Sequence, residues 1–190
     1  MPLLSALLLS LLADAATPTT PSKASGPVAT SAAAAEPGLV GQYFQLSDSL
    51  SEMPEIPKGQ KPDLQRVDRQ INFPSTQGAW TGTPFEDNFY VRWTGRLRAP
   101  KAGSYTFFLN SDDGSRLVID GRQVVLNGGT HDMIEIPGTI DLSAGDHEIL
   151  VEYFESEIDS GCILSWQGPE LRKQIVPPEV LFHPASGATK

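Results

Sequence analysis

The sequence contains 190 residues, of which 39% are hydrophobic and 19% are charged, a balance typical of a globular domain rather than a disordered chain. Its formal net charge of −9 argues against nucleic acid, and against an anionic membrane surface, as the partner. A cation or a neutral ligand fits this charge better. Cys162 is the single cysteine, so the chain can form no internal disulfide bond, and its apolar surroundings predict a buried, inert thiol.

Residues 1–16 are expected to form a signal peptide. An apolar run from Leu3 to Leu12 precedes Ala13-Asp14-Ala15, a small-x-small pattern typical of a cleavage site, although no Lys or Arg stands before the run. About ten apolar residues are too few for a membrane-spanning helix, which needs roughly 20. We therefore expect a secreted, periplasmic or otherwise extracellular protein that does not insert into the membrane.

Residues 17–37 are predicted to be a flexible linker. Ala, Pro, Ser and Thr dominate this stretch, and it has too little apolar surface to offset the entropy of ordering it. Residues 185–190 have a similar composition and are expected to be a disordered tail. One continuous domain is predicted between them, over residues 38–184.

Strand patterns fill most of this domain, and two long ones come first. Residues 89–97 and 103–111 each alternate large apolar side chains with polar ones, which places one apolar face inward. The residues expected on the inward faces are Val91, Trp93, Phe107 and Leu109.

Shorter strands follow. Asp120-Gly121 lies between two apolar runs and is a strong signal for a two-residue hairpin turn. Further strands are expected at residues 138–142, 147–154, 162–166 and 180–183.

Residues 48–69 contain three prolines and are expected to be largely loop, and no stretch of the domain has a sustained helical period. The fold class is therefore predicted to be all-β, an antiparallel β-sandwich or a partly closed β-barrel. Trp93 and Trp166 lie in predicted strands and are expected in its core.

Catalytic motifs are missing from the sequence. Its three histidines are scattered, and it contains no nucleophile elbow, no zinc-protease pair of histidines and no phosphate-binding glycine loop. We therefore expect a protein that is not an enzyme.

Paired carboxylates are the feature that most needs an explanation. Asp112 and Asp113 are adjacent at the end of an apolar strand, and Gly114 follows them; a second acidic loop begins at Glu155, after the strand of residues 147–154. Calcium prefers six to eight oxygen ligands in irregular geometry, so a calcium site built from two loops is one interpretation. A solvated acidic turn, or aspartates that cap a turn by accepting backbone N–H bonds, is the other.

Several blocks of the sequence resemble, in order, the anthrax protective-antigen domain family (the PA14 domain). The most specific are "VRWTG", "SDDGSRLVIDG" and "AGDHE", and "GLVGQYF" and "IVPPEVLF" lie near the two ends of the match. The resemblance covers about residues 38–183, which is nearly everything outside the signal peptide and the linker.

This resemblance implies a β-sandwich or barrel and an extracellular module that usually binds carbohydrate. In lectin members, such as fungal flocculins and adhesins, two adjacent aspartates joined by a cis peptide bond clasp a calcium ion that also takes two sugar hydroxyls. Asp112 and Asp113 match that pair. Glu155 falls where the fungal members carry an amide ligand, so a third carboxylate would replace it.

The function predicted from these observations is a secreted, calcium-dependent, lectin-like module that binds a glycan or a cell-surface polysaccharide, as in adhesion. The expected metal ligands are Asp112, Asp113 and Glu155, and the expected cofactor is Ca²⁺. Trp80 lies in a glycine-rich stretch, where it could stack on a sugar or pack in the core. The alternative function is a structural or accessory module of the same fold that binds proteins and no sugar.

Export should remove the residues up to about Ala15 or Ala16, because the cleavage pattern ends there. Mass spectrometry of protein recovered outside the cytoplasm would find this new N-terminus. Recovery of the protein from the cytosol with Met1 intact would contradict the prediction.

Overall fold

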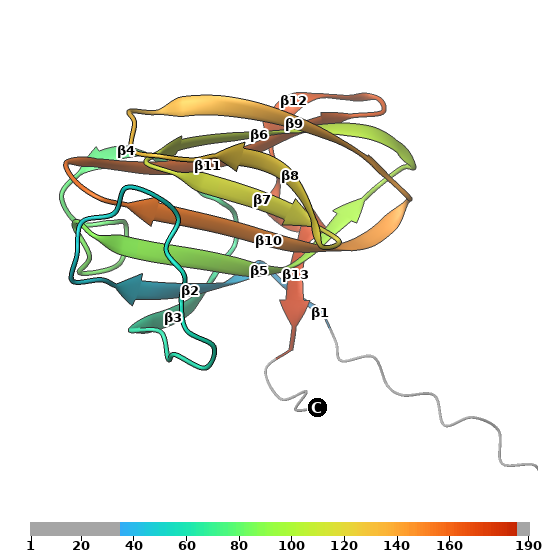
Figure 1. Ribbon diagram of the computed structural model, residues 1–190. Coiled ribbons are helices and arrows are strands. Elements are labelled where there is room, and N and C mark those ends of the chain that lie inside the picture. The colour runs from blue at the N-terminus through green and yellow to red at the C-terminus, as the bar shows by residue number, and fades with distance from the viewer. Residues whose placement is uncertain (1–34, 186–190) are drawn as a thin grey trace, which may run out of the picture. The chain divides into compact units, whose positions relative to one another are not determined.

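The computed structural model describes residues 35–185, which form two antiparallel β-sheets packed face to face (Figure 1). Within these residues the first sheet has eight strands, β1 (Ala35–Pro37), β2 (Leu39–Gln45), β3 (Leu64–Asp68), β5 (Phe89–Ala99), β7 (Ser115–Ile119), β8 (Arg122–Asn127), β10 (Gly145–Glu155) and β13 (Leu181–Pro184). The second has five, β4 (Asn72–Gln77), β6 (Gly103–Asp112), β9 (Ile134–Leu142), β11 (Asp159–Gly168) and β12 (Leu171–Ile175).

The two sheets remain separate layers, so the predicted all-β class is confirmed as a sandwich rather than a barrel. One turn of 3₁₀ helix, η1 (Pro178–Val180), precedes β13. In the part of the chain that the structure describes, no helix is long and apolar enough to cross a membrane.

Strand β10 organises the first sheet because it pairs with β5 on one side and with β7 on the other. Its register with β5 runs without a break from Gly145 opposite Ala99 to Glu155 opposite Phe89. In the second sheet β6 lies between β9 and β11. The ends of β10 and β6 therefore carry the two acidic loops.

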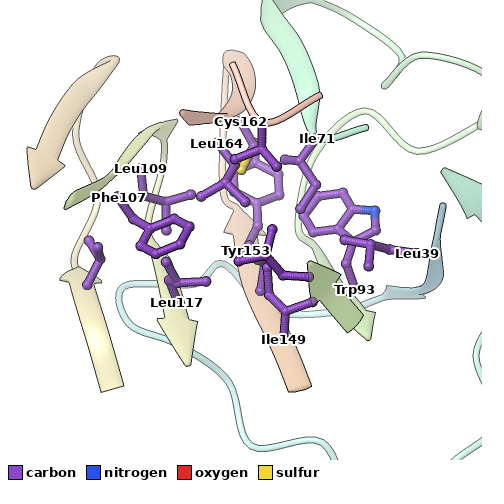
Figure 2. Close-up of a cluster of buried hydrophobic side chains, with 14 of the residues drawn as sticks. Leu39, Ile71, Trp93, Phe107, Leu109, Leu117, Ile149, Tyr153, Cys162 and Leu164 are labelled. Atoms are coloured by element: carbon purple, nitrogen blue, oxygen red, sulfur yellow. The ribbon is translucent and has the colours of Figure 1, made fainter. Parts of the chain in front are cut away.

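The core lies between the sheets and confirms the predicted inward faces. Phe107 and Leu109 of β6 are fully buried against the layer that contains Trp93, and Figure 2 shows side chains of both sheets meeting there. Val91, Trp166 and Cys162 are also buried, as expected. The alternating pattern therefore placed the apolar face correctly in both long strands.

A smaller apolar cluster lies on the outer face of the first sheet. Phe44, Tyr90 and Phe154 are buried there under partly buried side chains of the loop that follows β2, and these are Leu46, Leu50, Met53 and Ile56. This loop falls in the stretch predicted to be largely irregular. It covers the sheet next to the end of β10, where the amide of Leu50 donates to Ser156 Oγ at 3.2 Å.

The predicted hairpin forms, and a buried histidine ties it to a neighbouring turn. Asp120 and Gly121 have φ values of 48° and 74°, as a two-residue hairpin turn between twisted strands requires. His147 Nδ1 lies 2.6 Å from Asp120 Oδ2, and His147 Nε2 lies 3.0 Å from the carbonyl oxygen of Ser143. One imidazole thus joins the β7–β8 turn to the β9–β10 turn.

Some boundaries differ from the sequence prediction. Residues 35–37, expected at the end of the linker, form β1 and pair with β13, with Ala35 opposite Pro184. Strands β2, β3, β4 and β12 were not predicted. The short runs of β3, β4 and β12 are mostly polar or half-exposed, and the residues of β2 entered only as part of the family resemblance. The predicted signal peptide, most of the predicted linker and residues 186–190 of the predicted tail lie outside the described residues.

Replacing Phe107 with Ala should lower the free energy of unfolding by about 3–5 kcal/mol, because a fully buried ring would leave a cavity between the sheets. Chemical denaturation would measure this loss. Phe108→Ala is the matched control, since Phe108 is only half-buried on the opposite face of β6, and its loss should be much smaller. Equal losses would contradict the assigned strand face.

Candidate metal and ligand site

The three predicted metal ligands lie at neighbouring strand ends. Asp112 is the last residue of β6, and Asp113 and Gly114 connect β6 to β7. Glu155 is the last residue of β10, which pairs with β7. The amide of Phe154 donates to the carbonyl oxygen of Gly114 at 2.9 Å, so the two acidic loops are bonded to each other directly.

The structure brings the three carboxylates to one point. One carboxylate oxygen from each of Asp112, Asp113 and Glu155 lies within 4.8 Å of the others. Calcium–oxygen distances of 2.3–2.6 Å allow two ligands of one ion to lie up to about 5 Å apart. Asp112 and Asp113 are joined by a cis peptide bond, as the resemblance implied.

Backbone amides hold the Asp113 carboxylate in place. Its Oδ1 accepts a hydrogen bond from the amide of His131 at 2.8 Å, and its Oδ2 accepts one from Ser156 at 2.9 Å. These donors come from two different loops, one between β8 and β9 and the other after β10. Asp113 therefore links three loops while its remaining lone pairs stay free for a ligand.

Tyr153 contacts the other two acidic residues of the cluster through its hydroxyl group. Its hydroxyl donates to the main-chain oxygen of Asp112 at 2.5 Å and lies 2.9 Å from Glu155 Oε2, while it accepts a bond from the amide of Gly161 at 3.2 Å. A single O–H group cannot donate to both oxygens at once. The two oxygens therefore compete for the tyrosine proton, and its bond to Glu155 Oε2 favours the charged carboxylate by lowering its pKa, against the larger effect of burial.

Without a bound cation, burial and mutual repulsion make it unfavourable for all three carboxyl groups to be ionised at once. Burial is the largest cause that raises the pKa of Glu155 to about 9, and the charges of Asp113 and Asp112 add to it. Burial and the charge of Asp113 raise the pKa of Asp112 to about 6. The pKa of Asp113 is also raised by burial, against the two amide bonds that lower it.

One fully buried oxygen of the cluster has no hydrogen-bond partner in the structure. Glu155 is 0% exposed, and its Oε1 is buried without a hydrogen bond. A buried oxygen without a donor costs about 1–3 kcal/mol, and more if it is charged. A hard divalent cation would satisfy this oxygen and offset the repulsion, so the donor set fits such an ion.

Trp80, predicted as a possible sugar-stacking residue, lies in the core instead. It is 1% exposed, and its ring centroid lies 4.7 Å from that of Phe73 and 5.0 Å from that of Tyr153. Both ring faces are covered, so no sugar can stack on it. The glycines around Trp80 in the sequence suggested exposure, but they form the turns that let the ring fold back under Tyr153.

Sequence reasoning missed three residues that shape the site, namely Tyr153, His131 and Ser156. Two of them act through backbone amides, which carry no sequence signal. Tyr153 could have been found, because a tyrosine two positions before Glu155 on the same strand must point to the same side of the sheet.

The model of the PA14 domain family matches residues 35–179, which is most of the chain. The chain belongs to the PA14 domain family. The curated anti-sigma-I factor RsgI3 of Acetivibrio thermocellus is 28% identical over 151 residues, which cover 79% of this chain and 22% of that protein. This PA14 chain thus spans less than a quarter of that relative.

Two solved structures show the same fold. The PA14 sugar-binding domain of an RTX adhesin has a TM-score of 0.66 at 20% identity, with 77% of this chain and 98% of that chain covered. The A domain of epithelial adhesin 6 from Candida glabrata, in complex with Galβ1-3GlcNAc, has a TM-score of 0.59 at 14% identity, with 79% and 88% covered. At these identities the likeness establishes the architecture alone.

Without divalent cations, the PA14 domain should lose stability as the pH rises from about 4.5 to 9. The Glu155 carboxyl binds its proton more tightly when folded, with a pKa raised to about 9 from 4.5, so deprotonation favours the unfolded chain over this interval. One such group changes the free energy of unfolding by at most about 1.4 kcal/mol per pH unit.

Denaturation in chelator at several pH values would measure the slope, and Glu155→Gln should flatten it. Glu148→Gln is the control, because Glu148 is exposed on the same strand and should leave the slope unchanged. A Glu155→Gln profile equal to the wild type would contradict the assignment.

Proposed function

We propose that this PA14 domain is a secreted, calcium-dependent carbohydrate-binding module. The observation that carries the proposal is the convergence of Asp112, Asp113 and Glu155, together with the buried Glu155 oxygen that has no partner. Such an arrangement is costly for the protein alone and favourable once a cation joins it.

Calcium suits these donors better than magnesium. All three side-chain donors are carboxylates, and they come from two separate loops. Calcium tolerates six to eight oxygens in irregular geometry, whereas magnesium requires a tighter octahedron and releases its waters reluctantly. Main-chain oxygens, water or a ligand would have to complete the coordination.

The protein's part in binding is to present oxygen donors in a fixed arrangement. Asp113 is oriented by the amides of His131 and Ser156, and Asp112 is anchored through its main-chain oxygen by Tyr153. When bound, calcium would supply a positive centre with positions open to sugar hydroxyls. Rigid metal-binding side chains reduce the ordering cost of binding, so such a site can hold an uncharged glycan through its hydroxyl groups.

The comparison proteins support a glycan as the partner, since one is named a sugar-binding domain and another was solved with a disaccharide. A glycan or a polysaccharide at a cell surface is therefore the proposed ligand, and adhesion or glycan recognition is the proposed role. Export is part of this proposal, because such ligands lie outside the cytoplasm. Binding rather than catalysis is proposed throughout.

The second candidate is an accessory module that binds proteins and no sugar. It is favoured by Asp113, whose two oxygens both accept backbone amides and therefore already have a structural role as loop caps. The match to part of an anti-sigma factor also allows a protein partner for this chain.

Millimolar calcium should raise the melting temperature of the domain, and magnesium should raise it less. A ligand that binds only the folded state adds about 2.7 kcal/mol at a hundredfold excess over Kd. Asp112→Asn should abolish most of the shift, because it removes one of the three carboxylates expected to bind the ion. It should leave the calcium-free fold intact, because the Asp112 side chain makes no hydrogen bond within residues 35–185. Asp141→Asn, at the far end of β6 and β9, is the matched control and should keep the full shift.

Calcium binding and sugar binding can be separated by a second measurement. Binding to a glycan array should be detected with calcium and lost with chelator. A calcium shift without any bound glycan would favour the accessory module, and an unmoved melting curve would contradict the metal site itself.

A further inference from the structure

Four more acidic side chains surround the metal cluster. Asp132 follows His131, whose amide donates to Asp113, and Asp159 begins β11, in which Gly161 pairs with Asp112. Burial contributes most to the raised pKa of Asp112, and the charges of Asp113, Asp132 and Asp159 add to it. The charge of Glu157 likewise raises the pKa of Asp113, and the charge of Asp87 raises the pKa of Glu155. We call Asp87, Asp132, Glu157 and Asp159 the acidic rim.

The rim is built on three loops that the cluster itself holds together. The amide of Asn88 donates to the main-chain oxygen of Ser156 at 3.2 Å, and the amide of Ile158 lies 3.3 Å from Asp87 Oδ1. These contacts place Asp87 and Glu157 around a shallow depression beside the cluster. The residues that line it are Gly78, Glu86, Asp87, Asn88, Glu157 and Ile158.

Ile158 marks the edge of this depression. Its side chain is 75% exposed, and its φ of 82° is unusual for a β-branched residue. The turn therefore presents an apolar side chain next to acidic ones. Such an edge offers contact to the carbon face of a small polar ligand.

The cluster supplies an independent indication that this place receives positive charge. Glu155 is completely buried, yet its Oε1 has no donor, and one oxygen of its carboxylate lies within 4.8 Å of those of Asp112 and Asp113. A divalent cation there would be more than neutralised by the three cluster carboxylates. Counting the four rim carboxylates, about five negative charges would remain around the bound ion. His131 is the basic side chain that opposes them at Asp112 and Asp113.

We propose that the acidic rim makes this site selective for sugars that carry a protonated amine, over their N-acetylated and acidic counterparts. The inference rests on the carbohydrate-binding function proposed above and assigns its ligand class. An ammonium group on a sugar held at the cluster would lie among the rim carboxylates. An N-acetyl group has lost that charge, and a uronate would be repelled.

The size of the effect follows from the exposure of the rim, in which Asp87, Asp132 and Glu157 are exposed and Asp159 is half-buried. Exposed charge pairs are individually weak, but three or four that act on one ammonium group together give about a tenfold change in affinity. Their range is limited by salt, because the Debye length is about 8 Å at physiological ionic strength and about 3 Å at 1 M. Selectivity from the rim must therefore fade as salt is added.

The test is isothermal titration of the whole protein at saturating calcium with sugars that share one ring. Galactose, galactosamine, N-acetylgalactosamine and galacturonic acid form such a series, and the corresponding glucose series is run beside it. Galactosamine or glucosamine should bind about tenfold more tightly than its neutral parent, and the uronic acid should bind more weakly. In 0.5 M NaCl the differences should largely disappear.

Two variants test whether the acidic rim causes the preference for amino sugars. Asp132→Asn combined with Glu157→Gln neutralises two rim charges and should reduce the amine preference several-fold while calcium still saturates the site. Asp141→Asn removes one exposed charge elsewhere on the protein and should leave the preference unchanged.

Two negative results are distinguishable. If a neutral sugar binds with calcium and its amine analogue binds no more tightly, the selectivity proposed here is wrong while the carbohydrate function stands. If no sugar of either series binds in calcium, the carbohydrate function is contradicted and the assignment of its ligand class falls with it.

Discussion

Repulsion among three carboxylates is the constraint around which this end of the PA14 domain is organised. Asp112, Asp113 and Glu155 come together at buried strand ends, where low exposure strengthens every charge interaction. A protein can tolerate such a site in two ways, by keeping protons on the acids or by binding a cation. The raised pKa of Glu155 describes the first state, and the unpartnered oxygen of the same residue points to the second.

The rest of the fold makes this convergence rigid. Tyr153 holds the main chain of Asp112, and its ring packs against those of Trp80 and Trp93, with centroids 5.0 Å and 6.4 Å away. Phe89 completes the aromatic group from β5, opposite Glu155 in the ladder. The aromatic core therefore extends directly beneath the site, so any movement of the acidic loops would disturb the packing of both sheets.

The carboxylates of the site fall into an inner and an outer group that differ in burial. The inner carboxylates are buried and aimed at one point, which suits a small ion. Three of the outer ones, Asp87, Asp132 and Glu157, stand on exposed loops, where charges act over a distance and suit discrimination among ligands rather than tight binding. Both groups contribute to the net charge of −9, and they lie at one end of the domain. The net charge alone indicated only a cationic or neutral partner.

The sequence by itself determined the strand pattern and half of the site. Alternation along β5 and β6 identified the inward residues, because side chains in a strand alternate between its two faces, and Asp112 and Asp113 are neighbours in the chain. The acidic composition of the second loop made it one candidate to share an ion with them, and the resemblance to the PA14 family selected Glu155 within it, 42 positions from Asp113. Only the tertiary structure decided how deeply each side chain is buried and which atoms it contacts. Trp80 turned out to support Tyr153 instead of a sugar, and the amides of His131 and Ser156 orient Asp113, because long-range pairing of strands, not local sequence, brings those atoms together.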